Sequence, residues 1–163
     1  MTRDTGTTVA IRPAREEDMP DMLAVLEHAN MHHVPSPEMP ELDWRDCFVA
    51  EEGGRIAGMC GFRILSGTEA KTTLMAVAPA YRGKKVGFAL QARRMDELAG
   101  RGVETLTTNA DRPETIAWYK KHFGYQEIGT LAKEHEFGHP DIDHWTTLRT
   151  DLNAWKRRHE QES

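Results

Sequence analysis

The sequence is poor in cysteine and has no long apolar run, and both absences narrow what the protein can be. Its two cysteines, Cys47 and Cys60, lie among apolar residues with no basic, His or Cys partner spaced nearby. We expect them to be buried reduced thiols rather than a reactive site. No segment approaches the roughly 20 apolar residues that cross a bilayer, and residues 1–8 lack the apolar core of a signal peptide. We therefore expect a cytoplasmic protein with no membrane partner.

The composition lacks the extremes that mark disordered or fibrous chains. Hydrophobic residues make up 39% of the sequence and charged residues 29%, as in ordinary globular proteins. A chain of 163 residues fits one domain. We predict a single domain over residues 1–163, with flexible tails at 1–8 and 156–163.

Charge is unevenly distributed along the chain, although the formal net charge is only −5. Residues 1–52 hold 12 acidic and 4 basic residues, a balance of −8, whereas residues 81–102 hold 6 basic and 2 acidic residues, a balance of +4. A short basic segment on an acidic chain suits a small anionic ligand better than a nucleic acid, which needs a wide basic face. We predict no nucleic-acid partner.

Apolar periodicity and turn residues predict a mixed α/β sheet covered by helices. The expected strands are 9–12, 47–51, 55–65, 69–77, 103–108, 125–130 and 144–149. The expected helices are 16–29, 88–102, 113–123 and the tail from 150. In the second helix, the face expected to pack on the sheet comprises Phe88, Ala92, Met95 and Ala99.

A basic loop at 81–87 joins the strand 69–77 to the second helix. The first N–H groups of a helix have no intrahelical partner and lie at the positive end of its dipole, so they can bind a phosphate. Gly83 and Gly87 would let the backbone turn and approach a ligand, and Arg82, Lys84 and Lys85 add positive charge. On these residues alone, a phosphate loop and an ordinary strand-to-helix turn with solvated lysines are both open.

Two known phosphate motifs are absent from this loop. It lacks the Gly-Lys-Ser/Thr of a Walker loop and the Gly-x-Gly-x-x-Gly of a dinucleotide fingerprint. The loop instead resembles the acetyl-CoA loop of the GNAT superfamily, Gln/Arg-x-x-Gly-x-Gly/Ala after Val-x-Pro-x-Tyr. The matching residues are Val77, Pro79, Tyr81, Arg82 and Gly87. Lys85 stands where the family usually has glycine, and backbone donation there survives if Lys85 keeps a helical conformation.

A second signature of the same family follows one strand later. The family shows Ala-Ile-x-x-Tyr-x-x-x-Gly-Phe, and residues 115–125 resemble it as Thr115-Ile116-Ala117-Trp118-Tyr119-Lys120-Lys121-His122-Phe123-Gly124-Tyr125. The opening strand and helix, from Ile11 to Asp18, also look like a GNAT start. The resemblance covers roughly residues 9–130.

The resemblance implies a fold and an acyl donor. The fold would be a mostly antiparallel sheet of six to seven strands, splayed in the middle and flanked by about four helices. Acetyl-CoA would lie in the splay, with the Val77 N–H polarising the thioester carbonyl. The implied cofactor-binding residues are Met75, Ala76, Val77, Arg82, Gly83, Lys84, Lys85, Val86, Gly87, Phe88, Asn109 and Arg112.

Two of these assignments are open at the level of sequence. Some family members hold CoA with an Asn that corresponds to Arg112 here, and the nearest Asn is Asn109. Arg112 would either contact the CoA phosphates or merely begin a helix.

The resemblance also implies catalytic roles. Tyr119 is the family-matched acid that would protonate the leaving thiolate, and packing on the apolar face of its helix is the alternative. Glu69 is the candidate base, acting through a water, and a solvated position after a turn is its alternative. Further candidate bases are His32, His33, His135, His139 and His144.

We predict an N-acetyltransferase that moves an acetyl group from acetyl-CoA to a primary amine of a small molecule or protein, in a ternary complex. The acidic excess in residues 1–52 favours a cationic acceptor. The alternatives are a non-catalytic acyl-CoA-binding module and a metal-dependent enzyme that uses the segment 135–144, although its spacing fits no strong metal template. A homodimer is left open.

Overall fold

The structure is a computed structural model that describes residues 9–28, 43–83, 85–133 and 141–162, with side chains up to residue 158. The chain forms two compact units: the first comprises Met1–Phe62 and Thr73–Arg94, and the second comprises Arg63–Thr72 and Met95–Ser163. Two strands and one helix each contribute residues to both units. A single independent domain over the whole chain stays a prediction.

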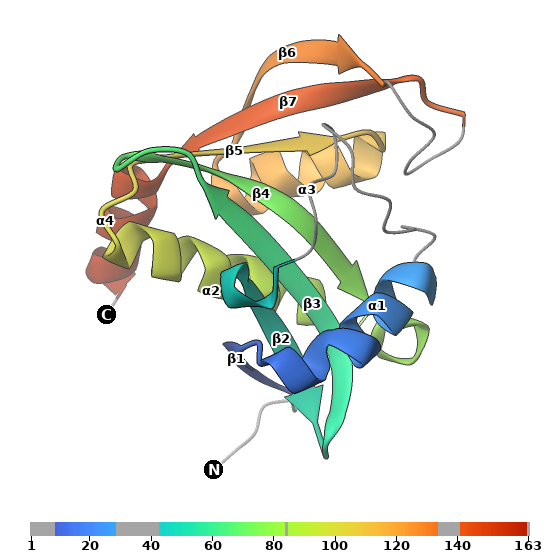
Figure 1. The fold of residues 1–163 in the computed structure, drawn as a ribbon. Coiled ribbons are helices and arrows are strands. Elements are labelled where there is room, and N and C mark those ends of the chain that lie inside the picture. Colours follow the sequence, from blue (N-terminus) through green and yellow to red (C-terminus); the bar gives the residue numbers. More distant parts are fainter. Residues whose placement is uncertain (1–8, 29–42, 84, 134–140, 163) are drawn as a thin grey trace. The chain divides into compact units, whose positions relative to one another are not determined.

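Seven strands of the described residues form one sheet in the order β1-β2-β3-β4-β5-β7-β6, and four α-helices accompany them (Figure 1). The pairs β1–β2, β2–β3, β5–β7 and β6–β7 are antiparallel, and the β4–β5 pair is parallel. This mixed sheet with its helices confirms the predicted fold class.

In the first unit, β1 (Ala10–Pro13), β2 (Cys47–Glu52) and the greater part of β3 (Arg55–Ile64) form an antiparallel ladder. The β2–β3 turn places Gly53 and Gly54 at φ 58° and 82°, the left-handed conformation that two-residue hairpin turns require. Helix α1 (Met19–His28) follows a short 3-10 turn at Glu16–Asp18.

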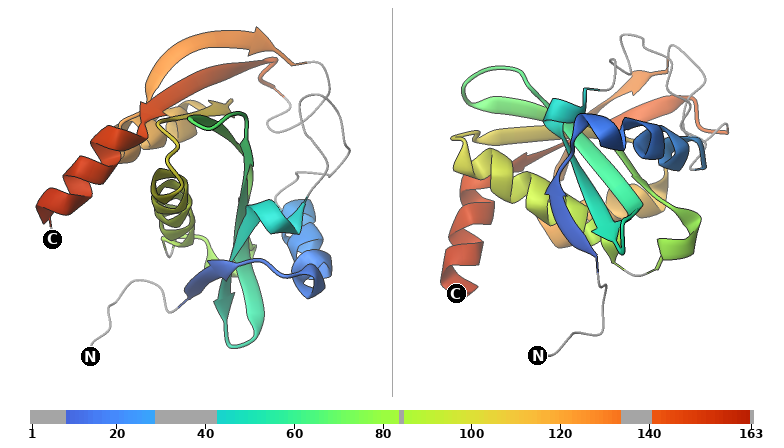
Figure 2. Two further views of the ribbon diagram at one scale, coloured as in Figure 1. Left: turned by 60° about the vertical axis from the view of Figure 1, so that its left-hand side comes forward. Right: turned by 60° about the horizontal axis from the view of Figure 1, so that its bottom comes forward.

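The second unit contains the start of β4 (Glu69–Val77), where Glu69, Ala70 and Lys71 pair with Thr105, Leu106 and Thr107 of β5 (Thr105–Ala110). Strand β7 (His144–Asp151) lies between β5 and β6 (Gln126–Ala132). Helix α3 (Pro113–Phe123) is capped by Gly124, which adopts a left-handed conformation with φ of 70°. Glycine adopts this conformation readily because it has no Cβ. Helix α4 (Leu152–Glu162) continues directly from β7 (Figure 2), so the backbone of residues 156–162 is helical.

The predicted buried face of the second helix, α2 (Val86–Gly100), was right at Met95 and wrong at Phe88, while Ala92 and Ala99 are partly exposed. Phe88 is 39% exposed, whereas the fully buried positions are Leu90, Gln91, Arg94, Met95 and Leu98. The buried face contains two polar residues, so a search for apolar spacing selected the neighbouring face.

Both cysteines are free and buried, as predicted. Burial raises the pKa of the Cys47 thiol to about 12 and also raises the pKa of Cys60, so both remain protonated near neutral pH. Among the described helices, none has the length and apolar character that a membrane span requires.

One ion-pair network joins β1 to β2 and to the 3-10 turn that precedes α1. The Arg12 guanidinium donates to both carboxylate oxygens of Asp18, at 2.8 and 3.1 Å, and to Glu51 at 2.6 Å. The hydrogen bond from Arg12 is the largest cause that holds the pKa of Asp18 below its usual range, and burial opposes it. Asp18 also accepts the backbone N–H of Arg15, which fixes the turn that precedes α1.

We predict that Asp18→Asn lowers the free energy of unfolding by about 2 kcal/mol at pH 7, because charge-assisted hydrogen bonds are lost. The folded-state pKa of Asp18 is lowered, so its contribution is present above the unfolded pKa of about 3.9 and is lost as the pH falls through the folded value. Urea denaturation at pH 7 and near pH 3 measures this, with exposed Glu17→Gln as the control. An equal loss at both pH values would contradict the assignment.

Candidate functional site

A backbone hydrogen bond fixes the end of β4 to β3. The N–H of Ala78 donates to the carbonyl of Ala57 at 2.7 Å, directly after Val77 ends the strand. A 3-10 turn, Pro79–Tyr81, then reverses the chain, with the Tyr81 N–H donating to Ala78 at 2.9 Å. These hydrogen bonds therefore fix the backbone from which the loop at 81–87 begins.

The Val77 N–H points away from β3. A Cβ built on Gly58 would stand 2.9 Å from the carbonyl oxygen of Ala76, so this carbonyl lies on the Gly58 side. In a trans peptide the C=O of one residue and the N–H of the next point in opposite directions. The Val77 N–H, which we expected to polarise a carbonyl, is thus not directed at Gly58 on β3.

Lys85 adopts a left-handed backbone conformation, with φ of 63°, and it is the one non-glycine residue with positive φ among those described. We expected backbone donation at this position only if Lys85 kept a helical conformation, and Lys85 lies outside the right-handed helical region. A left-handed conformation costs an L-residue about 1–2 kcal/mol. The backbone thus keeps the shape that a glycine would supply at this position, with a lysine in place.

The start of α2 carries the features of an anion site. A helical hydrogen bond runs from the Ala89 N–H to the carbonyl of Lys85, at 3.1 Å. The N–H groups of Val86 and Gly87 precede it, at the end of a helix where backbone amides in general lack intrahelical acceptors. The side chains of Arg82 and Lys85 are exposed around them, and Gly83 has φ of 79°. Lys84, the third predicted cation, lies outside the described residues.

The remaining loop-side candidates lie in the same unit. Met75 and Val77 are partly exposed on β4, and Ala76 between them is buried. In the first turn of α2, Val86 is buried and Gly87 is partly exposed. A Cβ on Gly87 would meet only the Val77 side chain, at 3.8 Å, an ordinary contact. Within the part of the chain that the structure describes, nothing therefore requires a glycine at 87.

Tyr119 lies in the second unit, on α3, and is 6% exposed. Its ring makes edge-on contacts with Trp118 and Tyr125, at centroid distances of 5.1 and 5.0 Å. Within the described part of the chain, its hydroxyl has no hydrogen-bond partner. A buried hydroxyl normally finds a partner, so this one is available to a bound group.

Glu69 is the first residue of β4 and Val77 the last, so the candidate base and the candidate carbonyl-binding N–H lie at opposite ends of one strand. The Glu69 side chain is exposed. Its backbone carbonyl accepts the N–H groups of Leu65 and Ser66, which closes the turn that precedes β4.

Asn109 and Arg112 flank the end of β5. The Asn109 side chain accepts a hydrogen bond from the Thr147 hydroxyl at 2.7 Å and is exposed. Arg112 begins α3, where its carbonyl accepts the N–H groups of Thr115 and Ile116. The helix-start role of Arg112 is therefore present, and its exposed side chain lies 4.0 Å from Glu114.

Of the candidate histidine bases, only His144 lies in the described residues. It is exposed, and its Nδ1 is 3.2 Å from Asp143. His32, His33, His135 and His139 lie outside the described residues. No group of three or more His, Cys, Asp or Glu side chains in the described ranges could hold a metal ion.

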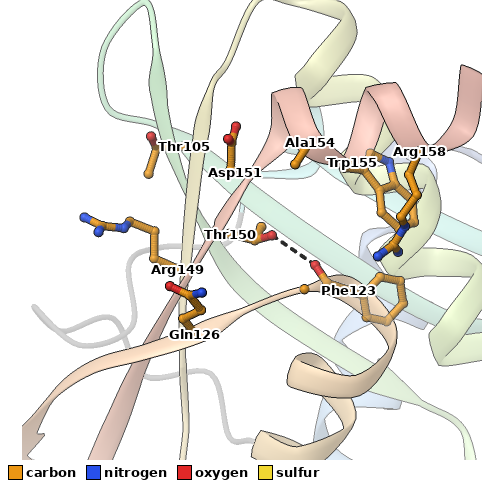
Figure 3. A pocket seen from close by; sticks show the side chains of 10 residues that line it. Thr105, Phe123, Gln126, Arg149, Thr150, Asp151, Ala154, Trp155 and Arg158 are labelled. Carbon is orange, nitrogen blue, oxygen red and sulfur yellow. Dashed lines mark hydrogen bonds between the residues drawn. The ribbon is translucent and has the colours of Figure 1, made fainter.

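A hollow of about 350 Å³ lies in the second unit, where β6 begins and α4 follows β7 (Figure 3). Arg149, Arg158 and Asp151 contribute to its wall. The Thr150 hydroxyl in the same wall donates to the Phe123 carbonyl at 2.9 Å. None of the predicted site residues lines this hollow, and both signs of charge are present in it.

Sequence reasoning missed the polar residues Gln91 and Arg94, which are completely buried in α2 directly after the loop. A signal was present: Leu90, Arg94 and Leu98 recur every four residues, which is the spacing of one helix face. An arginine at the centre of such a face was not counted, because charged residues are rarely fully buried.

The sequence from residue 12 to residue 125, more than half of the chain, matches the model of the acetyltransferase (GNAT) family. No curated protein matches the sequence. Several solved structures are similar in fold. One is the ribosomal-protein-S18-alanine N-acetyltransferase from Escherichia coli, with 22% identity and a TM-score of 0.72 over 89% of this chain and 94% of that one.

Two further solved structures contain a CoA compound. The protein yncA from Salmonella typhimurium, crystallised with its cofactor acetyl-CoA, has 18% identity and a TM-score of 0.69 over 90% of this chain and 95% of that one. The N-acetylglutamate synthase from Neisseria gonorrhoeae, complexed with coenzyme A and N-acetyl-glutamate, has 21% identity and a TM-score of 0.67 over 91% of this chain and 36% of that one. At these identities the likeness concerns the fold.

We predict that Lys85→Gly raises the free energy of unfolding by about 1 kcal/mol, because it removes the left-handed strain at φ 63°. Lys85→Ala is the matched control: it removes the same side-chain charge but keeps a Cβ in the strained conformation, so it should give no increase. Urea denaturation of the three proteins measures both. Equal stabilities of the glycine and alanine variants would contradict the left-handed conformation.

Proposed function

Because the chain belongs to the acetyltransferase (GNAT) family, we propose that it transfers an acetyl group from acetyl-CoA to a primary amine of a small molecule or protein. The main support is the loop between β4 and α2. It presents a helix N-terminus with two exposed cations, Arg82 and Lys85, and it follows a strand end whose Val77 N–H points away from β3. Acetyl-CoA carries a diphosphate, which a cationic helix N-terminus can bind, and a thioester carbonyl, which a backbone N–H can polarise.

The residues of the first unit would hold the donor. The first N–H groups of α2 would donate hydrogen bonds to the oxygens of the CoA diphosphate, and the exposed cations of Arg82 and Lys85 would offset its charge. Met75 and Ala76 would offer backbone groups to the pantetheine arm, in the manner of an added strand. The Val77 N–H would donate to the thioester carbonyl oxygen and stabilise the negative charge that develops there.

Acyl transfer breaks the thioester C–S bond and forms a C–N bond. The amine must lose a proton and the leaving thiolate must gain one. We propose that Tyr119 supplies the proton to the sulfur, because the residue is buried and its hydroxyl has no hydrogen-bond partner in the described residues. Glu69, the candidate base from the sequence, lies at the opposite end of β4 from Val77, roughly 26 Å away along the strand. This is too far for one bridging water, so the group that accepts the amine proton is left unassigned.

The acceptor is proposed to be cationic before it loses its proton. Residues 1–52 hold 12 acidic residues against 4 basic residues. In the described residues, the exposed acids of this segment include Glu16, Glu17 and Asp21 at the start of the first helical segment. Such a negative surface attracts amines over long range.

Acetyl-CoA should raise the melting temperature of the protein. At about 100 times its dissociation constant, a ligand that binds only the folded state adds about 2.7 kcal/mol to stability, which corresponds to several degrees for a chain of this size. Differential scanning fluorimetry with acetyl-CoA, propionyl-CoA and succinyl-CoA measures this. If none of them shifts the melting temperature at millimolar concentration, the proposed donor site is absent.

Tyr119→Phe should lower kcat by about 100-fold, the size of effect expected for a general acid. It should leave both the melting shift by acetyl-CoA and the free energy of unfolding near wild type, because no protein group loses a hydrogen bond. Thiol release in the presence of a panel of polyamines, aminoglycosides, amino sugars and peptides measures kcat. Tyr125→Phe, in the same ring cluster, is the control.

The same pair of variants separates catalysis from sensing. A non-catalytic acyl-CoA-binding module would show the melting shift, would release no thiol with any amine, and would be insensitive to Tyr119→Phe.

A further inference from the structure

Arg94 places a positive charge in the interior of the first unit. It lies in the middle of α2 and is 0% exposed. A guanidinium stays protonated at all physiological pH values, and a buried charge is strongly unfavourable unless hydrogen bonds surround it. Its position must therefore be fixed by the groups that solvate it.

Those groups come from three different elements. The Arg94 Nη1 donates to the carbonyl oxygen of Gly61 on β3 at 2.8 Å and to that of Leu74 on β4 at 3.2 Å. Its Nε donates to the side-chain oxygen of Gln91, one helical turn earlier, at 3.0 Å, and Nη2 donates to the same oxygen. One guanidinium thus joins α2 to two neighbouring strands.

The joined elements lead to the two ends of the candidate site. Along β4, Leu74 directly precedes the segment Met75–Val77, which we propose binds the acyl arm. Along α2, Arg94 follows the first turn, which begins at Val86 and which we propose binds the diphosphate. The hydrogen bonds of Arg94 therefore fix the helix relative to the strand on either side of the loop.

The packing next to the loop is equally close. A Cβ built on Gly58 of β3 would meet Leu90 at 3.2 Å, Val86 at 3.3 Å and the Ala76 carbonyl at 2.9 Å. The Cys60 thiol also approaches the Leu90 carbonyl, at 3.6 Å. The first two turns of α2 thus lie against β3 without space for one more methyl group, and a small movement of the helix would be transmitted to the loop.

Stability alone does not explain an arginine at this position. Replacing a buried charge by an apolar side chain of similar volume is often neutral or stabilising. An apolar side chain, however, fills space without fixing a direction, whereas hydrogen bonds to two carbonyls specify both distance and orientation.

We propose that Arg94 is a positioning residue that holds the N-terminus of α2 in register with Met75–Val77, so that one acyl-CoA molecule engages both at once. The inference rests on the proposed acetyl-CoA function. A ligand that is bound at two linked points gains affinity only when both points are correctly spaced. A loss of spacing weakens the whole ligand and leaves fragments that use one point unaffected.

The test compares the intact donor with a fragment. Calorimetric titrations of acetyl-CoA and of adenosine 3′-phosphate 5′-diphosphate, which lacks the pantetheine arm, would be made on wild type, Arg94→Met and Arg94→Lys. We expect Arg94→Met to weaken acetyl-CoA binding by about tenfold, the effect of one lost charge-assisted interaction. The fragment should bind within about twofold of wild type. Arg94→Lys keeps the positive charge but loses the planar guanidinium with its several N–H donors. Its affinity for acetyl-CoA should lie between those of wild type and Arg94→Met.

Arg101→Lys is the matched control, because Arg101 lies just after α2 and its exposed guanidinium donates from Nε to Glu97 at 2.9 Å. It should bind both ligands as wild type does. Equal losses for both ligands in the Arg94 variants, unchanged acetyl-CoA affinity, or failure of both variants to fold would each overturn the positioning role. If wild type itself binds no acyl-CoA, the proposed function falls first and this inference with it.

Discussion

The burial of a guanidinium that cannot lose its charge is the constraint on which the first unit depends. Arg94 must be solvated by protein, and the carbonyls of Gly61 and Leu74 do so from two neighbouring strands. The helix that carries Arg94 is therefore fixed relative to the end of β4. The chain between Val77 and Val86 has to connect the end of β4 to the start of α2. It does so with a 3-10 turn and two left-handed residues, Gly83 and Lys85. The conformation of the candidate phosphate loop is therefore constrained by the fixed position of α2 relative to β4.

Two local features favour a binding role over a purely structural one: the left-handed backbone of Lys85 and the Tyr119 hydroxyl, which has no hydrogen-bond partner in the described residues. A left-handed lysine persists only where the surrounding structure imposes it, and such residues concentrate at functional sites. In the second unit, aromatic contacts hold the Tyr119 ring, while no described residue uses its hydroxyl. Both features are compatible with one chemistry, in which an anionic thioester is bound and its sulfur is protonated.

The sequence predicted the elements well and their contacts poorly. The strand 69–77 has the bounds expected from its alternation, and Gly124 ends α3 as its left-handed preference predicts. The buried face of α2 could not be read from apolar spacing, because Gln91 and Arg94 satisfy each other and the strand carbonyls only after the chain has folded. The left-handed backbone conformation of Lys85 could not be predicted either, because it is decided by how the loop closes and not by the preference of lysine. The role of Tyr119 remains a prediction, and Glu69 lies at the opposite end of β4 from Val77.

The central claim is that the loop between β4 and α2 binds the diphosphate of acetyl-CoA. Phosphorus NMR of acetyl-CoA titrated with the protein tests it most directly, because the diphosphate and the 3′-phosphate give separate signals. The account predicts that the diphosphate resonances shift and broaden more than the 3′-phosphate resonance as protein is added. Diphosphate resonances that remain sharp and unshifted at millimolar protein, or a response confined to the 3′-phosphate, would contradict it.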